Sequence, residues 1–185
     1  MVVGIIADLL NTREDALRLL FCVLAGYPLA VIHRSFLYNK SAEIQHAAFA
    51  TIGVLLYIFN SGYNAIHGFT AILMAYGIIR FIGGTRESVV AAHVCFLGYL
   101  LVGYWFAESE AYDITWTTPF CIMTLRFIGL VMEVYDGAHY DSLKADMKKS
   151  AIREKPGLLE IAAFGLFYTG TFVGPQFNLN KFRSY

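Results

Sequence analysis

The chain has 185 residues, of which 57% are hydrophobic and only 15% charged, and its mean hydropathy is +0.55. A soluble domain usually has about 25% charged residues, so this composition is typical of a membrane protein. The 14 basic residues balance the 14 acidic ones, and this neutrality gives no support for a nucleic-acid partner.

Long apolar segments follow one another along the chain. A transmembrane helix needs about 20 mostly apolar residues, and five segments approach that length: 15–32, 47–64, 68–83, 89–106 and 114–134. A sixth, 158–173, runs into Gly174-Pro175, which should end a helix because proline restricts the preceding residue and lacks an N–H donor. No segment has a clean polar face, which counts against a very apolar soluble bundle. We therefore expect an all-α polytopic integral membrane protein with about five transmembrane helices and a partial sixth.

Positive charge falls on alternate loops. The loops after the second and fourth segments contain no Lys or Arg, whereas those after the first, third and fifth contain Arg34, Lys40, Arg80, Arg86, Lys144, Lys148, Lys149, Arg153 and Lys155. The positive-inside rule places these basic loops in the cytoplasm and the N-terminus in the lumen. Arg13 and Arg18 count mildly against this orientation. Trp105 and Trp116 flank the acidic fourth loop, as interfacial aromatic residues do.

Residues 136–157 form the long polar stretch, and we expect a cytoplasmic loop over about 135–157. Two interpretations are open. Asp141 or Ser142 caps a short helix that ends before Pro156 and whose basic face lies near anionic headgroups, or the stretch is a solvated linker.

Five polar residues are costly at their positions inside the apolar segments. Asn60, Asn64 and His67 are spaced i, i+4 and i+7, which predicts one helical face. Arg126 and Glu133 also share a face, but two turns separate them and prevent a direct pair. Such groups usually face a bundle interior or a wet cavity, so we predict that all five line a polar chamber, with a cavity or an interhelical partner for Arg126. The alternatives are that Glu133 snorkels to the interface and that the first three residues hold helices together.

The residues alone do not point to a catalytic group, and we expect no metal site and no bound cofactor. His93 stands alone in an apolar helix, and His67 has no nearby acid or nucleophile. We expect loops around His33, His46 and His139. The cysteines lie in apolar runs, typical of small core residues: Cys22, Cys95 and Cys121.

Four stretches resemble the membrane-bound O-acyltransferase family, and within it the lysophosphatidylcholine acyltransferases. They are ALRLLFCVLAGYPLAVIHRSFLY (16–38), YIFNSGYNAIHGF (57–69), YDITWTTPFCIMTLRFIGLVMEVYDG (112–137) and AIREKPGLLEIAAFGLFYTGTFVGPQF (151–177). The resemblance covers nearly the whole chain. It implies that residues 1–185 are the N-terminal portion of a single membrane domain of this fold, embedded in the endoplasmic reticulum.

The resemblance also implies a reaction in which an acyl group moves from acyl-CoA, a co-substrate, to the hydroxyl of a lysophospholipid during phospholipid remodelling. Membrane lipids are the implied partners, and homo-oligomers are a further expectation. The family's catalytic histidine follows a tryptophan, but here Trp105 precedes Phe106 and Trp116 precedes Thr117. We therefore assign no catalytic residue and expect a truncated chain that is inactive alone. The alternative is a non-catalytic membrane protein with a structural or regulatory role.

Overall fold

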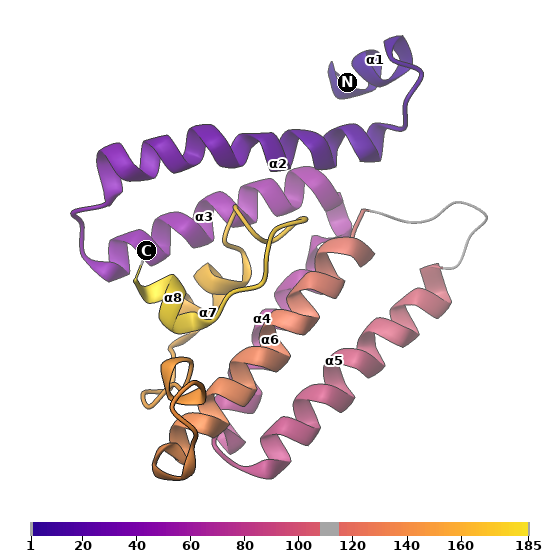
Figure 1. Ribbon diagram of the computed structural model, residues 1–185. Coiled ribbons are helices and arrows are strands. Elements are labelled where there is room, and N and C mark those ends of the chain that lie inside the picture. The colour runs from indigo at the N-terminus through magenta and orange to yellow at the C-terminus, as the bar shows by residue number, and fades with distance from the viewer. Residues whose placement is uncertain (1, 108–114, 185) are drawn as a thin grey trace.

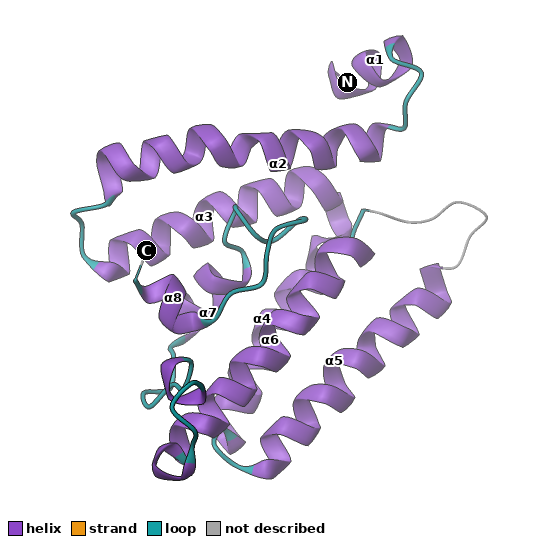
Figure 2. Ribbon diagram, in the orientation of Figure 1, coloured by secondary structure: helices purple, strands orange, loops and turns teal. Residues whose placement is uncertain are grey.

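The apolar segments form long helices. The computed structural model describes residues 2–107 and 115–184, and every regular element in that part of the chain is helical (Figure 2). The long helices are α2 (Glu14–Ile32), α3 (Ala42–Ser61), α4 (Ala65–Ile82), α5 (Arg86–Ala107) and α6 (Thr117–Ala138). The short helices are α1 (Val2–Leu9), α7 (Leu158–Gly165) and α8 (Leu179–Arg183). Single turns of π- or 3₁₀-helix lie at η1 (His33–Leu37), η2 (Gly62–Asn64), η3 (Tyr140–Ser142) and η4 (Met147–Lys149). The predicted all-α fold is confirmed.

Four helical stretches of the described chain are long and apolar enough to cross a membrane: Glu14–Leu37, Ala42–Ile82, Arg86–Phe106 and Thr117–Ala138. The second contains 41 residues, which at 1.5 Å per residue span about 60 Å, twice the thickness of a hydrocarbon core. It comprises α3 and α4 and corresponds to the second and third segments predicted from the sequence. The number of membrane crossings stays a prediction.

A glycine separates α3 from α4. Gly62 has φ +56° and ψ −129°, and its N–H donates to the carbonyl of Ile58 at the end of α3. Glycine adopts this positive φ without the steric cost that a Cβ brings. The predicted continuous face of Asn60, Asn64 and His67 is therefore wrong, because Asn60 lies in the last turn of α3, Asn64 lies in η2 and His67 lies in the first turn of α4.

The prediction of a helical sixth segment over 158–173 is also wrong in extent. The helix α7 ends at Gly165 after eight residues, and the chain continues in turns. The Thr171 hydroxyl donates to the Gly165 carbonyl at 3.1 Å, so a side chain supplies a donor to the end of α7. The Phe167 carbonyl accepts the N–H groups of Gly170 and Thr171, which close a turn after the helix. Most of the segment is buried in the bundle, where irregular backbone can satisfy its polar groups within the protein.

The helix α6 is central to the packing. Of its most apolar 18-residue window, 61% is buried, against 17% for α5 and 22% for the stretch that contains α2. It packs against α4 and α5 and also contacts α7, which lies against α3 (Figure 1). The core between these helices is largely aromatic, with fully buried side chains at Tyr57, Phe96, Phe120, Phe127 and Phe164. The many exposed apolar side chains on α2 and α5 suit a lipid environment.

The loops with basic residues lie away from η2. In Figure 1 the α2–α3 loop lies at the left of the molecule, the α4–α5 turn and the segment between α6 and α7 lie at the bottom, and the junction of α3 and α4 lies at the upper right. After α6 ends at Ala138, the rest of the stretch 136–157 has only the turns η3 and η4, which favours the linker interpretation over a capped helix. The Lys148 Nζ lies 5.1 Å and the Arg153 Cζ 4.9 Å from the centre of the Tyr140 ring, within the range of cation–π attraction.

Candidate functional site

The five predicted chamber residues fall into two groups. Asn60, Asn64 and His67 lie around η2, whereas Arg126 and Glu133 lie on α6. No ion pair joins Arg126 to Glu133 in the described part of the chain, as their two-turn separation predicts. Each has its own partners.

Asn60 ties the end of α3 to the residue that precedes Trp116. Its amide nitrogen donates to the Thr115 carbonyl at 2.8 Å, and the Ser61 hydroxyl donates to the same oxygen at 2.7 Å. Both side chains are buried, with exposed fractions of 3% and 7%. Two donors on one carbonyl make this a structural tie between α3 and the start of α6, which agrees with the helix-joining alternative for Asn60.

His67 belongs to an aromatic cluster. Its Nδ1 lies 2.8 Å from the Tyr99 hydroxyl on α5, and its ring stacks on Trp116 with centroids 4.0 Å apart. Trp116 is only 5% exposed, whereas Trp105 is 77% exposed, and the interfacial position of both residues stays a prediction. The nearby Asn64 is exposed. Tyr99 is therefore a polar partner of His67 that the sequence did not reveal.

Arg126 is the most deeply buried charged residue among those described, with 3% of its surface exposed. Its Nη1 donates to the carbonyls of Phe164 at 3.0 Å and Gly165 at 3.3 Å, and Nη2 donates to the Gly170 carbonyl at 2.7 Å. The guanidinium carbon also lies 4.8 Å from the ring centre of Phe177 and 5.5 Å from that of Phe164. We call this set, Arg126 with Phe164, Gly165, Gly170 and Phe177, the Arg126 clamp.

The clamp stabilises the end of a helix. The carbonyls in the last turn of α7 lack helical donors and carry the partial negative charge of the helix C-terminus. A guanidinium offers five N–H groups and suits several acceptors at once. Arg126 thus has an interhelical partner, as predicted, and that partner is a helix end rather than a carboxylate. Its role as a chamber-lining residue stays a prediction.

The residues after the Gly174-Pro175 turn are bonded to α6, the helix that carries Arg126. The Gln176 amide nitrogen donates to the Ile122 carbonyl of α6 at 3.0 Å, and Phe177 covers the guanidinium. At Gly170 a Cβ would lie 2.6 Å from the Arg126 Nη2, so a larger residue there would displace the guanidinium from its present position. The sequence singled out the Gly-Pro pair as a helix end, but not its attachment to Arg126.

Glu133 anchors the segment that contains α8. Its carboxylate accepts the Leu179 N–H at 3.1 Å, at the N-terminus of α8, where negative charge is favourable. The Asn180 amide donates to the carbonyls of Lys149 and Ala151, each at 3.1 Å. Glu133 is half-buried and has a defined partner, which differs from the snorkelling alternative.

A second tie joins α8 to α7. Arg183 forms a bidentate pair with Glu160, with nitrogen–oxygen distances of 2.6 and 3.1 Å. The hydrogen bond that Arg183 donates to Glu160 raises the pKa of Arg183 above its ordinary value. The segment after the Gly-Pro turn is therefore bonded to α6, to α7 and to the loop around residue 150.

Two histidines differ from their predicted loop positions. His46 lies in α3, where its ring stacks on Phe182 with centroids 5.5 Å apart. His33 lies in η1, is 3% exposed and has its Nε2 3.2 Å from the Gln45 side-chain oxygen. His93 bonds its own helix through the Val89 carbonyl, at 2.8 Å.

These arrangements can hold and orient groups. The Arg126 clamp cannot act as a general base, because a guanidinium keeps its proton in proteins. In the described ranges, no group of three or more His, Cys, Asp or Glu side chains is placed to hold a metal ion.

Comparisons with known proteins give the chain its relatives. It is 61% identical over 185 residues to lysophospholipid acyltransferase 5 of Caenorhabditis elegans, and it covers 39% of that protein. It is 36% identical over 178 residues to the Homo sapiens protein of the same name, covering 37% of it. Identity is 24% over 188 aligned positions with membrane-bound glycerophospholipid O-acyltransferase 1 of Mus musculus, of which 37% is covered.

The chain thus spans less than two fifths of the length of these relatives. Residues 101–185, which include α6, α7, α8 and the whole Arg126 clamp, match the profile of the membrane-bound O-acyltransferase family. The match identifies a membrane-bound O-acyltransferase domain over residues 101–185, and the similarity along the entire chain agrees with the resemblance recognised in the sequence.

Proposed function

We propose that this chain forms the scaffold of an enzyme that transfers an acyl group from acyl-CoA to the free hydroxyl of a lysophospholipid. The observation that carries the proposal is the 61% identity, over all 185 residues, to a relative named as a lysophospholipid acyltransferase. Sequence identity falls to 24% with membrane-bound glycerophospholipid O-acyltransferase 1 of Mus musculus. The higher identity to the lysophospholipid acyltransferase favours a lysophospholipid as the acyl acceptor.

The helices have definite roles in this proposal. The bundle forms one wall of a reaction chamber in the endoplasmic reticulum membrane, with the N-terminus in the lumen and acyl-CoA arriving from the cytosol. The Arg126 clamp fixes the Gly-Pro turn against α6, so that the backbone after α7 has one conformation when lipid is present. Asn60, Asn64, His67 and Glu133 supply further polar lining.

We place the general base in the part of the relatives that this chain does not match. No histidine follows a tryptophan here, and the half-buried His67 is held between Tyr99 and Trp116. Base catalysis by a histidine contributes typically 10²–10⁴-fold, so the scaffold alone should not reach an enzymatic rate.

A chimera tests the proposal. The matching segment of the Caenorhabditis elegans relative is replaced by residues 1–185, and acyl transfer from acyl-CoA to lysophosphatidylcholine is measured in membranes that have little such activity of their own. We expect the chimera to approach the rate of the intact relative. The matched control carries Arg126→Leu, which should lower the rate while the amount inserted in the membrane is unchanged. An inserted chimera with no transfer overturns the proposal.

A further inference from the structure

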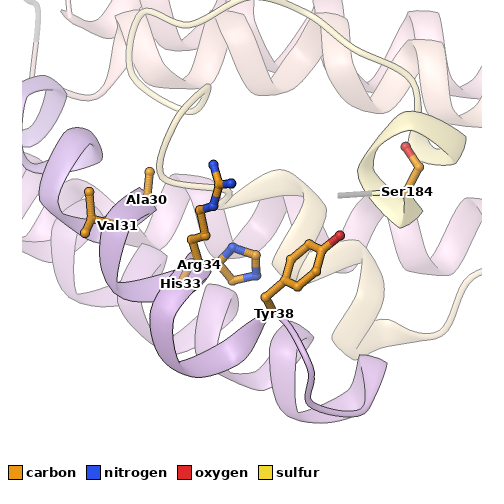
Figure 3. Close-up of a pocket in the computed structure, with 6 residues that line it drawn as sticks. All are labelled: Ala30, Val31, His33, Arg34, Tyr38 and Ser184. Carbon is orange, nitrogen blue, oxygen red and sulfur yellow. The ribbon is translucent and has the colours of Figure 1, made fainter.

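A cavity of about 640 Å³ lies where α2 turns into η1. One wall comes from α2 and η1, and the other from the residue after α8 (Figure 3). The lining residues are Ala30, Val31, His33, Arg34, Tyr38 and Ser184. The cavity shares no residue with the Arg126 clamp or with the His67 cluster.

The turn that forms the cavity is held in place by Gln45. The Gln45 amide nitrogen donates to the carbonyls of Lys40 at 3.0 Å and Tyr38 at 3.4 Å, so the Gln45 side-chain oxygen faces His33 Nε2 at 3.2 Å and accepts a hydrogen bond from its N–H. The Tyr38 N–H also bonds the His33 carbonyl at 3.0 Å, the wide closure of a π-turn. Such turns often occur at functional sites. The floor of the cavity is therefore fixed before any ligand arrives.

The groups that face the cavity suit an anion. Arg34 is exposed and forms no ion pair in the part of the chain that the structure describes, and none of the lining residues is acidic. The Tyr38 hydroxyl points toward Ser184 across the opening (Figure 3). A guanidinium can donate several charge-assisted hydrogen bonds to phosphate oxygens, and the hydroxyl groups of Tyr38 and Ser184 are further donors in the lining.

The remaining lining suits a lipid rather than a small ion. Val31 is 65% exposed, and Ala30 and Val31 belong to the candidate span Glu14–Leu37. The apolar side of the cavity thus continues along a helix that can face acyl chains. The cavity also lies beside the α2–α3 loop, which the positive-inside rule assigns to the cytoplasmic side, and basic pockets between helices at that side are typical sites for phosphorylated headgroups.

We propose that this cavity binds the phosphate of a membrane phospholipid headgroup, with Arg34 as the main ligand and Tyr38 as a hydroxyl donor. This site is separate from the proposed acyl transfer, and it stands whether or not the chimera is active. A soluble phosphate compound shares the same chemistry, so the experiment must separate the two sources.

The test measures binding to the purified 185-residue chain in detergent. Phosphatidic acid presents a phosphate monoester, and diacylglycerol with the same acyl chains lacks it. We expect Arg34→Gln to weaken phosphatidic acid binding about tenfold or more, because a charged hydrogen bond is lost, and to leave diacylglycerol binding unchanged. Arg80→Gln, an exposed arginine at the end of α4, is the matched control and should bind like the wild type.

A second variant and a competitor complete the test. Tyr38→Phe should cause a smaller loss of phosphatidic acid binding with the fold intact. Glycerol 3-phosphate that fails to displace the lipid supports the headgroup as the source, and tight, Arg34-dependent binding of glycerol 3-phosphate alone assigns the site to a soluble phosphate instead. Equal binding by the Arg34→Gln and Arg80→Gln variants, or no preference for phosphatidic acid over diacylglycerol, overturns the proposal.

Discussion

Replacing Arg126 by leucine should open the turn between α7 and α8 without unfolding the bundle. The change removes the hydrogen bonds that Arg126 donates to the carbonyls of Phe164, Gly165 and Gly170. The Gly165 carbonyl still accepts a hydrogen bond from the Thr171 hydroxyl, so we count only the losses at Phe164 and Gly170. Hydrogen bonds to charged groups contribute about 1.5–3 kcal/mol each, so two of them at the lower end give about 3 kcal/mol. That free energy corresponds to roughly a 100-fold increase in the local opening equilibrium.

Hydrogen exchange measures this opening directly. The N–H groups of Gly170 and Thr171 both donate to the Phe167 carbonyl, at 3.0 and 3.1 Å, so they exchange only when the turn opens. In the detergent-solubilised Arg126→Leu variant, we expect these amides to exchange about 100 times faster, while those in the middle of α4 keep their wild-type rates. Arg80→Leu is the matched control, since it removes an exposed arginine. Unchanged exchange at Gly170 and Thr171, or an equal increase throughout the protein, would refute the clamp.

Three further predictions concern the bends, the orientation and the end of the chain. Gly62→Ala should destabilise the bundle by about 1–2 kcal/mol in thermal unfolding because of its positive φ, whereas Gly129→Ala, where a Cβ meets no atom within 4 Å, should be neutral or slightly stabilising; equal effects would contradict the strained turn. In intact microsomes Asn39, in the loop before α3, should stay unglycosylated although it begins an Asn-Lys-Ser acceptor pattern. A cysteine that replaces the fully exposed Tyr63 should react with an impermeant maleimide only after the membrane is permeabilised. A glycan on Asn39 would show the opposite orientation. Arg183→Leu should speed amide exchange in α8 by no more than about fivefold, because partly exposed pairs contribute at most about 1 kcal/mol. Because the pKa of Arg183 is raised, its contribution to stability is fully present below the ordinary pKa of arginine and is lost only as the pH rises through the raised pKa. The ratio of the exchange rates of the Arg183→Leu variant and the wild type should therefore be constant between about pH 6 and 8. A ratio that changes in this range contradicts the prediction.

Periodic and compositional features of the sequence predicted the long helices well. The apolar segments became α2 to α6 with shifted ends, whereas the cytoplasmic position of the basic loops stays a prediction. Such features depend on many residues at once, so a few exceptions such as Arg13 and Arg18 do not change the result. The helix α3 begins five residues before the predicted segment because polar residues such as Gln45 still fit a helix whose outer end is not in the apolar core.

Predictions that depended on one residue or on distant contacts were less successful. A helical face through Asn60 and His67 assumed a regular helix, and the positive φ of Gly62 breaks it. The sixth segment is apolar along its length, yet Thr171 and Arg126 take the acceptors that further helical turns would need. No local pattern joins Arg126 to Gly170, which lies 44 positions away. Its high burial cost did mark Arg126 as a residue that needs partners.

The central claim is that this chain provides the scaffold of a lysophospholipid acyltransferase and does not itself provide the catalytic base. The most direct measurement is acyl transfer from acyl-CoA to lysophosphatidylcholine by the purified 185-residue chain, beside the chimera under the same conditions. We predict transfer by the chimera and none above background by the chain alone. Measurable transfer by the chain alone that is abolished by His67→Ala or His93→Ala would contradict the claim, because a histidine assigned here to packing would then be the base.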